Sequence, residues 1–139
     1  MNTKLLALDI YGTILSSTDA DNQLPPRKGL LKLLDSCEEL KIRAITTSDA
    51  DLNDAIAVLK RIGLASRLES FELRGAPKEF GPIIAYYGIR PEELLVIGDS
   101  QEADINGAIN IGARYLKVPK YIRPETRDLF DFIQVIALL

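Results

Sequence analysis

LLALDIYGT, residues 5–13, begins with a short apolar run that ends at an acid. A second stretch, LLVIGDSQEAD at residues 94–104, has the same arrangement. Short, fully apolar runs predict strands that are buried on both faces, as in a parallel sheet. In such a sheet the ligand site lies beyond the carboxyl ends of the strands. We therefore expect Asp9 and Asp99 to project at the same edge of one sheet.

Amphipathic stretches alternate with apolar ones along the rest of the chain. Strands are predicted at 42–46, 68–73 and 113–118, the second of them near a sheet edge, and a loop at 12–22. Helices are predicted from Pro25 through Leu40, from Ser48 to Ile62 with Ser48 and Asp51 as a capping box, from Pro77 to Tyr87, and from Ala103 to Ile111. The tail from Pro124 predicts a short helix and then a strand or turn at 132–136. This alternation predicts an α/β, three-layer Rossmann-like domain with a mainly parallel central sheet.

The composition narrows the possible chemistry. The 139 residues fit one domain, 1–139, and 47% hydrophobic residues are enough for a core. With no histidine, Ser-His-Asp and Cys-His catalysis are excluded, and the single cysteine cannot form an internal disulfide. A net charge of −3 argues against a nucleic-acid partner. We find neither a signal peptide nor a membrane span, so we expect a cytoplasmic protein without a membrane partner.

Three carboxylates are expected to share the carboxyl edge of the sheet. Asp104 follows Asp99 by about one helical turn and can face the same crevice as Asp9. At ~4 Å, each pair would repel by about 4 kcal/mol at an effective dielectric constant of 20. Mg²⁺ would relieve this repulsion, because it prefers carboxylate oxygens together with water and phosphate. The alternative is structural, with Asp9 starting a loop and Asp104 capping a helix.

The two acidic stretches resemble motifs of one superfamily. DIYGTIL, residues 9–15, resembles the first motif of the haloacid dehalogenase (HAD) superfamily, and GDSQEAD, residues 98–104, resembles its fourth motif. Thr47 ends a strand as the hydroxyl residue of the second motif does, and Lys78 lies where the third motif has its lysine. All four motifs occur in order, and the resemblance covers nearly the whole chain. It implies a HAD-like fold and a magnesium-dependent phosphohydrolase that acts on a phosphate monoester.

The resemblance also implies roles for the matching residues. Asp9 would be the nucleophile that forms an aspartyl-phosphate. Magnesium would be held by Asp9, Asp99 and the backbone carbonyl of Tyr11, with Asp104 supporting the metal from nearby.

Phosphate oxygens would be bound by Thr47 and Lys78. The sequence does not separate Thr46 from Thr47 as the phosphate-binding hydroxyl, and Thr47 could instead cap a helix. Lys78 could instead be a solvated lysine in the first turn of a helix, although a cation is slightly unfavourable there.

Tyr11 is the main departure from the phosphatase pattern. HAD phosphatases have a second Asp at this position, which protonates the leaving oxygen and then activates water. A tyrosine, with a pKa of about 10, could donate a proton but would rarely act as a base at neutral pH. We therefore expect slow turnover or a trapped phospho-enzyme, unless another acid such as Asp49 substitutes. Asp49 could also be a surface acid that the helix N-terminus favours.

A tyrosine at position 11 is also compatible with two other functions. Tyrosine at this position resembles the DxYGT motif of 2-haloacid dehalogenases, which act without metal beneath a cap domain, whereas Asp99 and Asp104 argue for a metal. A catalytically weak or inactive HAD-like module that binds metal and phosphate is the other alternative.

The intervals 15–42 and 47–78 are too short for a cap domain, so the site is expected to be open. An open site implies a phosphorylated substrate that is either macromolecular or small, a small one being covered by a neighbouring subunit in a homo-oligomer.

Overall fold

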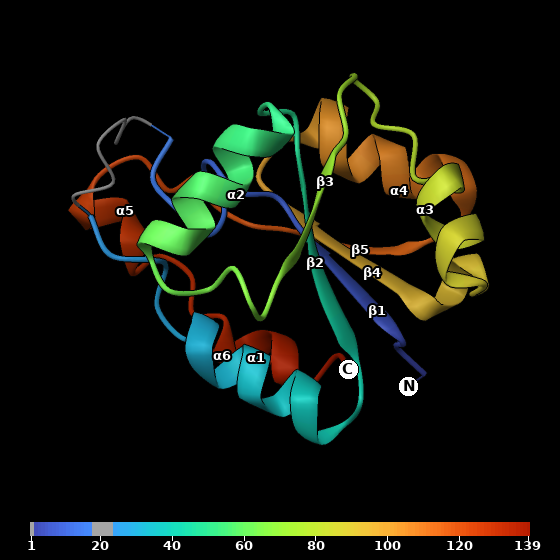
Figure 1. Ribbon diagram of the computed structural model, residues 1–139, viewed down its shortest axis with the longest axis horizontal. Coiled ribbons are helices and arrows are strands. Elements are labelled where there is room, and N and C mark those ends of the chain that lie inside the picture. The colour runs from blue at the N-terminus through green and yellow to red at the C-terminus, as the bar shows by residue number, and fades with distance from the viewer. Residues whose placement is uncertain (1, 18–23) are drawn as a thin grey trace.

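The computed structural model describes residues 2–17 and 24–139, and within them the strands form one parallel sheet (Figure 1). The strands are β1 (Leu5–Leu8), β2 (Arg43–Ser48), β3 (Glu69–Glu72), β4 (Leu94–Gly98) and β5 (Arg114–Lys117). They lie in the order β3-β2-β1-β4-β5, and every neighbouring pair is parallel. The predicted α/β fold and the edge position of β3 are confirmed. Of the predicted loop 12–22, residues 18–22 lie outside the described part.

Helices cover both faces of the sheet and complete three layers (Figure 1). One face packs against α1 (Leu30–Glu39), α2 (Leu52–Arg61) and the short α6 (Ile133–Ile136), and the other against α3 (Gly81–Tyr87) and α4 (Asn106–Ile111). A short helix α5 (Pro124–Arg127) lies in the tail. The described residues form this one layered unit, and the absence of a cap domain stays a prediction.

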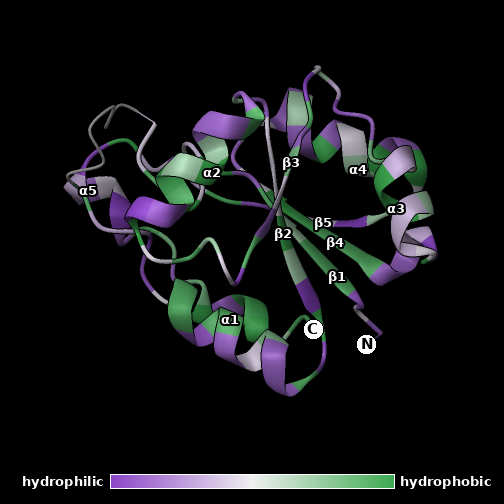
Figure 2. Ribbon diagram, viewed as in Figure 1, coloured by the Kyte–Doolittle hydropathy of each residue, from purple (hydrophilic) through white to green (hydrophobic). Residues whose placement is uncertain are grey.

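Strands β1 and β4 form the middle of the core. Residues of β1 and β4 alternate between the two faces, with Leu6, Leu8, Leu95 and Ile97 on one and Leu5, Ala7 and Val96 on the other. Figure 2 shows these strands as almost continuously hydrophobic, whereas hydrophilic and hydrophobic residues alternate along the helices. Burying one such side chain contributes about 1.5–3 kcal/mol. The core therefore holds the carboxyl ends of β1 and β4 side by side.

Two boundaries in the first half of the chain differ from the prediction. Helix α1 begins at Leu30 rather than at Pro25, because the backbone N–H of Arg27 donates to the carbonyl of Ile14 (2.8 Å) and Gly29 takes a left-handed conformation (φ 82°). Strand β2 continues through Ser48, which pairs with β3 and is therefore no helix cap. Asp51 alone caps α2, accepting from the N–H groups two and three residues on.

Three later elements also differ. Helix α3 begins at Gly81 rather than at Pro77, so Lys78 lies in the loop before it. The predicted helix 103–111 is divided into a π-helical turn, Gln101–Ile105, and α4. The strand or turn predicted at 132–136 is wrong, because Ile133–Ile136 form α6, and the first N–H of this helix, that of Ile133, donates to Asp131 Oδ1 (2.9 Å). No helix in the described ranges is both long and apolar enough to span a membrane.

Candidate active site

Three carboxylates converge at the carboxyl edge of the sheet. Asp9 follows β1, Asp99 follows β4, and Asp104 comes from the π-helical turn that follows β4. One oxygen from each lies within 4.8 Å of one from the others. The two acids from separate strands meet because their strands are hydrogen-bonded neighbours in register.

Two glycines leave room for these carboxylates. Gly12 has φ +88°, and a Cβ added there would lie 2.7 Å from Asp99 Oδ2. A Cβ on Gly98 would collide with Asp104 Oδ2. Asp99 is also held by Thr13, whose hydroxyl donates to Asp99 Oδ1 (3.2 Å). Gly12 and Gly98 therefore leave the space that the acids need, and Thr13 holds Asp99 by a hydrogen bond.

Lys78 forms hydrogen bonds to two of the three acids. Its Nζ donates to Asp104 Oδ1 (2.7 Å), Asp9 Oδ1 (3.2 Å) and the carbonyl of Thr47 (2.6 Å). The side chain is 3% exposed. These three acceptors take up all three ammonium protons. The backbone N–H of Lys78 donates to the carbonyl of Ala103 (3.0 Å), which fixes the lysine beside Asp104.

Burial and charge shift the protonation of this cluster. Burial raises the pKa of Asp9 to about 8, with Asp104 and Asp99 adding to the rise and Lys78 opposing it. The pKa of Asp104 is also raised, mainly by burial. Burial works against the charge of Lys78, but Asp9 and Asp104 outweigh it and raise the pKa of its ammonium group. The cluster thus has one ammonium group, bound to two of its three acids, and this one charge does not balance three carboxylates.

The residues present suit a hard divalent cation. All the side-chain donors at the cluster are carboxylate oxygens, which Mg²⁺ prefers over nitrogen or sulfur. A divalent cation bound between the carboxylates would balance the negative charge that the single ammonium group of Lys78 does not balance. On the described residues, the donor set and its charge therefore fit magnesium.

Thr46 and Thr47 point to opposite faces of β2. Leu8 pairs with Thr46, so Thr47 lies level with Asp9, and its carbonyl accepts from Lys78. The Thr46 hydroxyl instead donates to Ser70 on β3 (3.3 Å). The Thr47 hydroxyl is buried without a hydrogen-bond partner among the described residues, although Thr47 is not part of the cavity wall. The geometry thus favours Thr47 over Thr46 as a residue of the site.

A cavity of about 190 Å³ opens above the carboxylates. The predicted residues Asp9, Tyr11, Asp49, Lys78, Asp99 and Asp104 all line it. Burial raises the pKa of the Tyr11 phenol, an effect that Arg61 on α2 opposes, so the phenol stays protonated at neutral pH.

Sequence reasoning missed four residues of the cavity wall. Ser17, Ser100, Ala103 and Lys120 also line it. A signal for one of them was present, because Lys120 follows closely on the predicted strand 113–118 and therefore comes to the same edge of the sheet.

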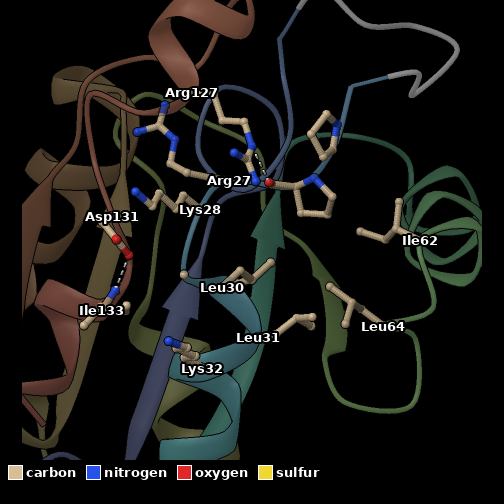
Figure 3. A pocket seen from close by; sticks show the side chains of 13 residues that line it. Arg27, Lys28, Leu30, Leu31, Lys32, Ile62, Leu64, Arg127, Asp131 and Ile133 are labelled. Atoms are coloured by element: carbon tan, nitrogen blue, oxygen red, sulfur yellow. Dashed lines mark hydrogen bonds between the residues drawn. The ribbon is translucent and has the colours of Figure 1, made fainter.

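A second, larger cavity of about 490 Å³ lies elsewhere, around the start of α1 (Figure 3). Its wall is mostly apolar, with Leu31, Leu64 and Ile133 among the side chains drawn. Its one carboxylate, Asp131, accepts from the N–H of Ile133, as the dashed line in Figure 3 shows. This cavity lacks the grouped acids of the first one, so we place the candidate active site at Asp9.

Comparisons with known proteins agree with this fold. A family model described as "HAD-hyrolase-like" matches residues 74–125, the part that contains Lys78, Asp99 and Asp104. No curated protein matches the chain.

Several solved structures are similar in fold. A predicted phosphoglycolate phosphatase from Haemophilus somnus 129PT is 13% identical, with a TM-score of 0.72 over 99% of this chain and 98% of that one. A HAD-superfamily hydrolase from Ehrlichia chaffeensis is 15% identical, with a TM-score of 0.74 over 99% and 96%. The L-2-haloacid dehalogenase from Xanthobacter autotrophicus is 13% identical, with a TM-score of 0.63 over 84% and 77%. The chain therefore has the fold of the HAD-like hydrolases.

Proposed function

We propose that the protein is a magnesium-dependent phosphohydrolase that cleaves a phosphate monoester through an aspartyl-phosphate on Asp9. The observation that carries this proposal is the placement of Asp9 within 4.8 Å of both Asp99 and Asp104, with Lys78 bound to Asp9 Oδ1. A carboxylate cannot approach a dianionic phosphate unless cations screen the charge. In this cluster Lys78 supplies one cation and the acids can hold a second.

Asp9, Asp99 and the backbone carbonyl of Tyr11 would hold the metal, with Asp104 close by. When bound, Mg²⁺ neutralises the carboxylates and draws charge from the phosphoryl oxygens. Lys78 would keep Asp9 oriented and share the charge of the phosphoryl group. The Thr47 hydroxyl, which has no partner among the described residues, would be the hydroxyl that donates to a phosphoryl oxygen.

The reaction would run in two displacements. In the first, one Asp9 oxygen forms a bond to phosphorus while the ester P–O bond breaks, and the leaving oxygen takes a proton. In the second, water attacks the same phosphorus, the bond to Asp9 breaks, and phosphate leaves with the carboxylate restored. Asp9 must be ionised to attack, so a cation that lowers its raised pKa also activates it.

Proton transfer is the part of the reaction to which the side chains of this site are least suited. The phenol of Tyr11 can give a proton to the leaving oxygen, but the phenolate that this leaves has a raised pKa and takes a proton back from solvent at neutral pH. The neutral phenol that results cannot deprotonate water for the second displacement. Asp49 lines the same cavity, and its carboxylate is the group that could deprotonate the attacking water. We therefore propose that hydrolysis of the aspartyl-phosphate limits turnover.

The site is proposed to work without a cap domain of its own. A phosphorylated macromolecule could reach the open cavity directly, or a second copy of the chain could cover a small substrate. We expect neither nucleic acid nor membrane as a partner, and a cytoplasmic location.

An assay with 4-nitrophenyl phosphate tests the proposal. We expect phosphate release that needs Mg²⁺ and disappears in Asp9→Asn. Magnesium binding without turnover across a broad panel of phosphate esters would instead favour a metal- and phosphate-binding module, the alternative that Tyr11 supports. Metal-independent chloride release from 2-chloropropionate would favour a dehalogenase.

A further inference from the structure

Lys120 stands at the mouth of the catalytic cavity without a partner among the described residues. It belongs to the loop that follows β5, lines the cavity around Asp9 and is exposed to solvent. No ion pair or hydrogen bond holds its ammonium group within residues 2–17 and 24–139. Lys78, the other lysine of the cavity wall, is already bound to three acceptors at the floor. Of the described residues that line the cavity, Lys120 is therefore the cation without a partner.

Hydrogen bonds fix the loop on both sides of Lys120. The carbonyl of Pro119 accepts from Nη2 of the buried Arg27 (2.6 Å). The backbone N–H of Tyr121 donates to the carbonyl of Gly12 (2.8 Å), and the Tyr121 hydroxyl donates to the carbonyl of Pro25 (2.7 Å). One of these bonds ties the loop to Gly12, close to Asp9, and the other two tie it to the segment before α1, so the Lys120 backbone has a defined position beside the cavity.

The cavity has a buried floor and an open rim. Asp9, Asp104 and Lys78 at the floor are each less than a tenth exposed, whereas Asp49 and Lys120 at the rim are exposed. A phosphoryl group attacked by Asp9 must lie on the floor. The rest of the substrate then extends past the rim, where Lys120 attracts an anion and Asp49 repels one.

We propose that Lys120 binds a second anionic group, carried by the leaving part of the substrate. This inference rests on the proposed phosphohydrolase function and specifies its substrate class. The class is phosphate monoesters whose alcohol bears a carboxylate or a further phosphate. Lys120 contributes to specificity and takes no part in the displacement at phosphorus.

Two matched aryl esters test this assignment. 4-Carboxyphenyl phosphate and 4-carbamoylphenyl phosphate have nearly the same shape and differ in one negative charge. The ratio of their kcat/KM values measures the preference for the anion. We expect Lys120→Ala to lower this ratio about two- to fivefold, the effect of one partly exposed ion pair, and Lys120→Glu to lower it further. Lys117→Ala is the control, because Lys117 is exposed but lies outside the cavity wall, and it should leave the ratio unchanged.

Salt gives an independent readout, because high ionic strength screens an exposed ion pair. The preference of the wild type should shrink in high salt, and that of Lys120→Ala should not. An unchanged ratio in Lys120→Ala, or an equal loss with both esters, would overturn the assignment while leaving the phosphohydrolase in place.

If no ester turns over, the proposed function fails separately, and the same comparison is made by calorimetry with the two corresponding aryl phosphonates and Mg²⁺. Tighter binding of the carboxyl phosphonate that is lost in Lys120→Ala would still support the anion site. Equal binding of the two would refute it.

Discussion

Replacing Lys78 by methionine tests the electrostatic balance of the site. Methionine keeps an unbranched stem but removes the ammonium group, which leaves Asp9, Asp104 and the carbonyl of Thr47 without their shared donor. The lysine is 3% exposed and Asp104 is 1% exposed, so water has little access to replace it. Removing one partner of a buried ion pair costs about 3–5 kcal/mol. We expect Lys78→Met to lose this amount of unfolding free energy in the metal-free protein at pH 7.

Urea denaturation in the presence of a chelator measures this loss. Far-ultraviolet circular dichroism is the suitable signal, because the chain has no tryptophan. Lys117→Met is the matched control, since Lys117 is exposed and lies outside the cluster, and its change should stay within about 0.5 kcal/mol. The loss in Lys78→Met should become smaller toward pH 5, because Asp9 already holds a proton at pH 7 and protonation of Asp104, whose pKa is also raised, removes the remaining charge that the lysine no longer balances.

Two results would refute this reasoning. One is a loss below about 1 kcal/mol at pH 7, since it would mean that water or a rearrangement replaces the ammonium group at little cost. The other is a loss that does not change with pH. Should Lys78→Met be unfolded at pH 7, refolding at pH 5 would support the account, and an unfolded chain at both pH values would contradict it.

Further predictions concern the metal site and the chemistry. Gly12→Ala should weaken Mg²⁺ binding in calorimetry, because its Cβ displaces Asp99, whereas Gly63→Ala, also at positive φ but in open space, should only reduce stability. Tyr11→Asp should raise phosphate release by up to about 10²- to 10⁴-fold by restoring the acid-base group, and an unchanged rate would exclude that explanation. Because the folded protein holds a proton on Asp9 up to about pH 8, the unfolding free energy without metal should fall as pH rises from about 4 to about 8. Asp9→Asn should flatten this dependence, and an equally steep curve would contradict the raised pKa.

Sequence patterns were sufficient for the central part of the fold and for the acids. The apolar runs ending at Asp9 and at Asp99 correspond to β1 and β4, which are neighbours in the sheet, and parallel pairing then brings their acids together. Lys78 was identified through its order among the motifs. Its three acceptors come from β1, β2 and the turn after β4, which no local pattern could reveal.

Helix boundaries were less predictable, because tertiary contacts decide them. Ser48 has the side chain of a cap, but pairing with β3 keeps it in a strand. Residues after Pro25 have helical character, yet the bond from Arg27 to Ile14 holds them outside α1. The position of Lys120 after the predicted strand 113–118 indicated the right edge of the sheet, but its place in the cavity wall depends also on the bond from its loop to Gly12.

We propose that Asp9 attacks phosphorus at a site where three carboxylates share one divalent cation. A phospho-enzyme can be detected by mass spectrometry of protein quenched in acid after exposure to Mg²⁺ and 4-nitrophenyl phosphate. We expect one added phosphoryl group located on Asp9, dependent on Mg²⁺, absent in Asp9→Asn and reduced in Asp99→Asn. A phosphoryl group on another residue, or phosphate release without any labelled protein, would contradict it.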